Sequence, residues 1–232
     1  MSPTGESILK CLQAVAAERA LRASDPSLAP RVTAVKAFQH ARFAHSYADL
    51  LADKRYGKAA VFFLEDLYGP GDFTERDDQF ARIVPALVRM FPREIVGTVA
   101  DLASLHALSE RLDTAMARLL QSPALDGRRY GELWRAVGEP PAREQQIALM
   151  LAVGNALDKY TRNPLLRHSL RLMRSPAKAA GMGALQQFLE TGFDTFRAMG
   201  GAQEFLRTIA ERERALAAML FGGGEVVGPQ SS

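Results

Sequence analysis

Cysteine is nearly absent from this chain, and that scarcity excludes two kinds of structural cross-link. Cys11 is the only cysteine among 232 residues, so no disulfide can form within the chain. A zinc site built from several thiolates is excluded for the same reason.

The chain also lacks a long apolar run and a recognisable leader. Its most apolar stretch, residues 147–153, is far shorter than the roughly 20 residues that a membrane-spanning helix needs. Residues 1–10 contain no basic stretch followed by an apolar one, which is the pattern of a secretory signal. We therefore expect a cytoplasmic protein without a transmembrane segment.

The chain also lacks a large excess of either positive or negative charge. The formal net charge is only +3, with 47% hydrophobic and 24% charged residues. These values are typical of a globular domain with a sizeable core, and such a small net charge does not indicate a nucleic-acid-binding protein. We expect one domain over residues 1–221, with a sub-boundary near residues 122–141, and a flexible tail over residues 222–232.

No segment shows the strict alternation of a half-exposed strand, and the apolar residues recur at spacings of three and four. This spacing is typical of α-helices, and the prolines and glycines divide the chain into pieces of helical length. The sequence predicts an all-α bundle of eight to ten helices. The longest pattern, over residues 92–121, predicts a central helix about 45 Å long.

Aromatic residues gather in residues 62–80. Gly69, Pro70 and Gly71 predict a turn there, and Asp72 with Glu75 fits a capping box at the start of the next helix. The segment has two interpretations. It could form an apolar pocket or a partner-binding patch with Tyr68 at its polar edge, or it could be a helix–turn–helix corner buried in the core.

Residues 62–68 read FFLEDLY. They resemble the bacterial protein family named for its FFLEELY motif, with Asp66 in place of the second glutamate. Residues 72–77, 82–85 and 105–110 are also similar to that family, and the resemblance extends over most of the chain. The family is uncharacterised, so the resemblance implies no activity, cofactor or site residue.

Four histidines raise the question of a metal or a haem. His40 and His45 lie about 140° apart around a helix, so they do not form a ligand pair. His106, Glu110 and Asp113 do share a stripe, which is half of what a carboxylate-bridged metal site requires. The alternative is a solvated or hydrogen-bonded polar stripe. Haem could be bound through His45 or His106, but we expect no cofactor.

Recognisable catalytic patterns are missing. There is no Gly-x-Ser-x-Gly elbow, and Gly222 to Gly224 follow a predicted helix instead of opening one, as a phosphate-binding loop would. Cys11 has no histidine near it in sequence, so its pattern does not indicate a nucleophile.

Basic residues dominate residues 128–178, with ten Lys or Arg against four Asp or Glu. Arg167, Arg171 and Arg174 share one helix face, which could bind phosphates, an acidic partner or a membrane surface. A solvated face is the favoured interpretation, and nucleic acid is not a favoured partner.

Our leading hypothesis is a non-enzymatic binding or adaptor protein that uses the aromatic corner of residues 62–80. Its candidate contact residues are Phe62, Phe63, Glu65, Asp66 and Tyr68. A protein partner and a second copy of the chain both remain open. The alternatives are a metal- or haem-dependent enzyme using His106 and Glu110, and binding of nucleic acid or an acidic partner through residues 128–178.

Overall fold

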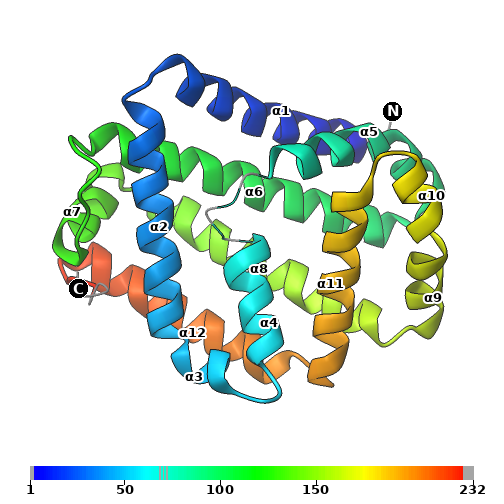
Figure 1. Ribbon diagram of the computed structural model, residues 1–232. Helices are drawn as coiled ribbons and strands as arrows, with labels where there is room; N and C mark the ends of the chain where they lie inside the picture. The colour runs from blue at the N-terminus through cyan, green and yellow to red at the C-terminus, as the bar shows by residue number, and fades with distance from the viewer. Residues whose placement is uncertain (1–2, 68, 70, 72, 227–232) are drawn as a thin grey trace.

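The computed structural model describes the whole chain except residues 1–2, 68, 70, 72 and 227–232. Every regular element in this described part is helical, which confirms the all-α prediction (Figure 1). None of the described helices combines the length and the apolar character required of a membrane-spanning segment.

The longer helices agree in number with the expected eight to ten. They are α1 (Pro3–Ser24), α2 (Leu28–Ser46), α5 (Thr74–Met90), α6 (Arg93–Leu119), α7 (Gly127–Val137), α8 (Pro140–Thr161), α9 (Pro164–Leu172), α11 (Gly183–Met199) and α12 (Gln203–Phe221). Three short helices complete the described set, namely α3 (Ala48–Ala52), α4 (Gly57–Phe62) and α10 (Arg174–Ala179).

The central helix predicted over residues 92–121 is α6, with 27 residues. It crosses the middle of the molecule in Figure 1 and packs against α1, α2, α5, α7 and α8. Apolar residues spaced three and four apart cover its inner faces. The same faces also carry Glu110 and Asp113, which are 4% and 6% exposed. The bundle is therefore built around a helix that buries charge as well as apolar surface.

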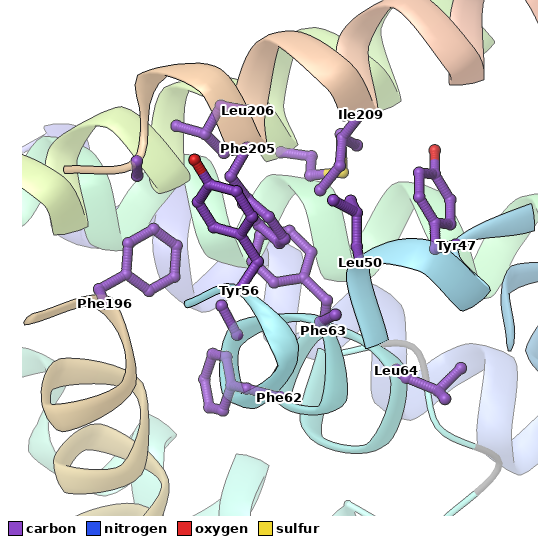
Figure 2. Packing of buried hydrophobic residues seen from close by; sticks show 14 of the residues in the cluster. Tyr47, Leu50, Tyr56, Phe62, Phe63, Leu64, Phe196, Phe205, Leu206 and Ile209 are labelled. Carbon is purple, nitrogen blue, oxygen red and sulfur yellow. The ribbon is translucent and has the colours of Figure 1, made fainter. Parts of the chain in front are cut away.

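The aromatic corner is largely core. Phe62 and Phe63 are 3% and 1% exposed, and Figure 2 shows them among side chains from α11 and α12. The ring centroid of Phe63 lies 5.5 Å from that of Phe205 in an edge-on arrangement. The rings of Phe62 and Phe63 are therefore packed in the core of the fold and are not exposed at its surface.

The chain leaves α4 through a π-helical turn, Phe63–Leu67. Such turns are rare and widen the helix by one residue. The predicted cap Asp72 lies outside the described residues. Phe73 precedes the first residue of α5 and makes no side-chain capping bond, while Glu75 accepts a hydrogen bond from Gln79 at 2.8 Å.

Other boundaries follow the breaks that the sequence predicts. Gly181 lies between α10 and α11, and Gly183 is the first residue of α11, whereas Pro85 lies inside an undivided α5. Of the tail predicted over residues 222–232, Val226 is 9% exposed and belongs to the cluster around Trp134. Residues 227–232 lie outside the described part.

Substitution of Gly192 in α11 would show how tightly the aromatic corner packs. A Cβ at this position would lie 2.9 Å from the Phe62 ring, so Gly192→Ala should lower the free energy of unfolding by about 1–3 kcal/mol. Gly97→Ala in α6 is the control, because nothing lies within 4 Å of its added Cβ. The control should be about 0.5–1 kcal/mol more stable than the wild type. Urea unfolding measures both, and equal stability of Gly192→Ala and the wild type would show loose packing here.

Candidate ligand site: a polar cavity beside the central helix

A cavity of about 90 Å³ lies beside α6. Its walls come from α2, α6, α7, α8 and α12, together with Gly69 and Phe73 of the aromatic segment, residues 62–80. It contains more charged groups than a buried space normally does. The charged side chains in its lining are Lys36, Arg42, Glu110, Asp113, Arg143 and Glu213.

Four of these charges form ion pairs. Lys36 Nζ lies 2.5 Å from Glu110 Oε1, and Arg22 also binds the Glu110 carboxylate. Burial alone would raise the pKa of Glu110, but these two cations lower it below its usual value. Arg42 donates to Glu213 at 2.5 Å. Burial would lower the pKa of Arg42, but Glu213 raises it. Each of these four charged side chains therefore has an oppositely charged partner within the protein.

Arg143 is different because its polar contacts are with uncharged groups. It is 3% exposed. Its Nη1 donates to Gln146 Oε1 at 3.2 Å, and its Nη2 contacts Met116 Sδ at 3.3 Å. A thioether is only a weak acceptor. Among the described residues Arg143 forms no ion pair, and burial lowers the pKa of its guanidinium.

Trp134 supports Arg143 without neutralising it. The guanidinium carbon of Arg143 lies 3.8 Å from the centre of the indole ring, which is a cation–π contact. Within the described part of the chain, Trp134 Nε1, Arg143 Nε and Arg42 Nε are buried N–H donors without an acceptor. Three residues that line one cavity thus retain unused hydrogen-bonding capacity, which is uncommon in a folded core.

Asp113 is the other charged group in the lining without a cationic hydrogen-bond partner. It accepts a hydrogen bond from Gln39 Nε2 at 3.0 Å. Burial raises the pKa of Asp113, and the neighbouring Glu110 acts in the same direction. The neutral carboxyl is therefore favoured more than usual, and a neutral carboxyl can donate a hydrogen bond as well as accept one.

The stripe of His106, Glu110 and Asp113 does not converge on a common point. His106 Nε2 lies 2.7 Å from Asp77 Oδ2 on α5, and Arg19 on α1 binds the same oxygen at 2.6 Å. Glu110 and Asp113 have the separate partners described above. The described residues contain no group of three metal-ligating side chains placed to bind an ion.

Glu65 and Asp66 of the aromatic segment form hydrogen bonds with different partners. Glu65 is exposed, with its Oε1 3.1 Å from His40 Nε2. Asp66 is partly buried, which raises the pKa of its carboxyl, and its backbone carbonyl accepts a hydrogen bond from Arg76 at 2.8 Å. Tyr68 lies outside the described residues. Of the described residues of this segment, Gly69 and Phe73 line the polar cavity.

The basic face of α9 and α10 is paired with acids of α11. Arg167 donates to Asp194 at 2.9 Å, Arg171 lies 3.8 Å from the same carboxylate, and Arg174 binds Glu190. These acids lie just beyond the basic stretch in sequence. The excess of positive charge in residues 128–178 is therefore partly neutralised in the fold.

Arg143 and Trp134 were not predicted as site residues, although the sequence contains a signal for Arg143. Arg143 stands at the spacing i, i+4, i+7 with Ile147 and Met150, and both of these are buried in α8. A charged residue in register with an apolar stripe is expected to be buried. Trp134 is the only tryptophan in the chain.

The cavity lies within a recognised family domain. Residues 18–226 match the model of a family described as a domain of unknown function, DUF8198. The chain belongs to this family. None of the curated proteins compared with the chain matches it, and no solved structure does. The match to DUF8198 does not test the resemblance to FFLEELY motif proteins.

Asp113 should make stability depend on pH. Its pKa is raised in the folded protein, so its stabilising contribution is complete below the unfolded value of about 3.8 and is lost as pH rises through the folded pKa. Asp113→Asn keeps the oxygen that Gln39 binds but does not ionise. Relative to the wild type, the variant should therefore gain unfolding free energy as pH rises above about 3.8 toward neutrality. Urea unfolding across this range measures the gain, and a constant difference between the two proteins would contradict it.

Proposed function

We propose that this protein is a non-enzymatic binding protein whose polar cavity holds a small anionic molecule, or the anionic group of a larger one. The observation that carries the proposal is the buried guanidinium of Arg143, whose described polar contacts are Gln146 and Met116. An oxyanion would supply the charge and the acceptor that Arg143 lacks in the protein alone.

The energetics of Arg143 favour a functional role. An unpaired buried charge is destabilising by several kcal/mol, and well-packed apolar residues in place of buried charges are often neutral or stabilising. A residue retained for packing alone would more readily be Met or Leu. The flat guanidinium on Trp134 presents its donors in a fixed fork, which suits carboxylate and phosphate groups.

The other lining groups complete the proposed anion site. Lys36 and Arg42 add positive charge on the α2 side, although each already binds a carboxylate. Asp113 in its neutral form could donate to a second oxygen of the bound molecule. Trp134 Nε1 and Arg42 Nε are further buried donors without acceptors among the described residues.

The proposal changes the part assigned to the aromatic corner. Phe62 and Phe63 support the fold from within the core, while Gly69 and Phe73 border the cavity. The binding role expected for residues 62–80 is thus proposed for Gly69 and Phe73 within that range. Membership of the FFLEELY motif family and a cytoplasmic location remain part of the proposal. The cytoplasm is proposed because the lone Cys11 cannot form an internal disulfide.

Trp134 provides a direct measurement because it is the only tryptophan. Titration with acetate or phosphate should change its fluorescence and raise the melting temperature, since a ligand that binds only the folded state stabilises it. Sodium chloride at matched ionic strength is the control for screening. Arg143→Met should abolish both responses, while its stability without added anion should equal or exceed that of the wild type.

Two further variants make the test specific. Arg207→Met removes the same charge from an exposed pair with Glu211 and should leave both responses intact. Arg143→Lys keeps the charge without the planar fork and should retain weakened binding. A wild type that responds to neither anion would overturn the proposal. So would a destabilised Arg143→Met that still responds to them, because Arg143 would then be structural.

A further inference from the structure

A second cavity lies on the other side of His106 and Ser109. Its volume is about 110 Å³, and its walls come from α1, α5, α6 and α11. Most of its lining is apolar, contributed by Leu12, Phe80, Ile83, Leu87, Val99, Leu102, Ala103, Leu105, Leu185, Phe188 and Leu189. An apolar cavity of this size can hold a hydrocarbon group, as the binding of benzene in a cavity of about 150 Å³ shows.

Among the described residues, four polar side chains line this second cavity, namely Arg76, Asp77, His106 and Ser109. His106 and Ser109 also line the polar cavity, so the polar end of the apolar cavity faces the polar cavity. Ser109 accepts a hydrogen bond from Gln146 at 2.8 Å, and Gln146 in turn binds Arg143. One chain of contacts therefore connects Arg143 with Ser109, a residue that lines both cavities.

Arg76 of α5 also lies where the two cavities adjoin. Its guanidinium carbon lies 4.2 Å from the ring centre of Phe73 and 4.6 Å from that of Phe188. Phe73 lines the polar cavity and Phe188 lines the apolar one. Phe73 and Arg76 of the aromatic segment thus lie where the two cavities adjoin.

We infer that the molecule bound by this protein is a single-chain anionic amphiphile. Its anionic head occupies the polar cavity beside Arg143, and its hydrocarbon tail occupies the apolar cavity past His106 and Ser109. This inference rests on the proposed function, because the polar cavity must bind an anion. It adds the chemical class of the molecule, an alkyl carboxylate or an alkyl phosphate.

The test is to titrate the protein with acetate, butyrate, hexanoate and octanoate in turn, each below its micelle-forming concentration. Calorimetry and Trp134 fluorescence measure the binding of each compound. Each added methylene should tighten binding about fourfold until the apolar cavity is full. Octyl phosphate in place of octanoate distinguishes the two kinds of head. Octanol, which has the tail without the charge, should bind more weakly than octanoate.

Ala103→Leu fills the apolar cavity from its buried wall on α6. It should flatten the chain-length series and leave the affinity for acetate unchanged. Val99→Phe is a second filling variant that should have the same effect if Ala103→Leu does not fold. Ala215→Leu, at an exposed position of α12, is the matched control and should retain the wild-type series.

The outcomes separate this inference from the proposed function. Acetate binding without any gain from longer chains would overturn the amphiphile and leave the anion site intact. A gain that survives both filling variants would also overturn the amphiphile, because the tail would then lie elsewhere. If octanol binds as tightly as octanoate and neither acetate nor phosphate binds, both the amphiphile and the anion site are overturned.

Discussion

Charged side chains buried on α6 must each be met by a group from a neighbouring helix, because an unpaired buried charge is destabilising by several kcal/mol. Glu110 is met by Arg22 of α1 and Lys36 of α2. Burial and hydrogen bonding act on Asp77 of α5 in opposite directions, and the bonds from His106 and Arg19 prevail, lowering its pKa. These contacts fix α1, α2 and α5 around the central helix at particular positions. Apolar packing alone would tolerate more sliding between them.

Much of the helical framework could be predicted from sequence because it follows local rules. The pattern of residues 92–121 became α6, and the apolar spacing of three and four residues correctly predicted helices throughout the described chain. The core role of Phe62 and Phe63 was one of two interpretations, since an aromatic cluster has the same composition in a core and in a pocket. Only the positions of α11 and α12 decide between them, and those depend on contacts distant in sequence.

The candidate site was harder to predict because its residues come from five helices and one loop. His106, Glu110 and Asp113 were recognised as a polar stripe, but their partners on α1, α2 and α5 could not be inferred from spacing along one helix. Arg167, Arg171 and Arg174 presented the same difficulty, since the acids that pair with them belong to α11. Arg143 could have been suspected from its register with Ile147 and Met150. Its lack of a charged partner is a property of the fold alone.

Two departures from good packing lie close together in this molecule. Apolar side chains line most of a cavity of about 110 Å³, and the buried charge of Arg143, which has no ion-pair partner among the described residues, is destabilising. Either defect alone could be an accident of a tolerant core. Two that adjoin at His106 and Ser109, one charged and one apolar, are complementary to the two ends of one amphiphilic molecule, which would remove both penalties on binding. A single bound molecule is therefore a simpler explanation of the core of this bundle than two unrelated faults.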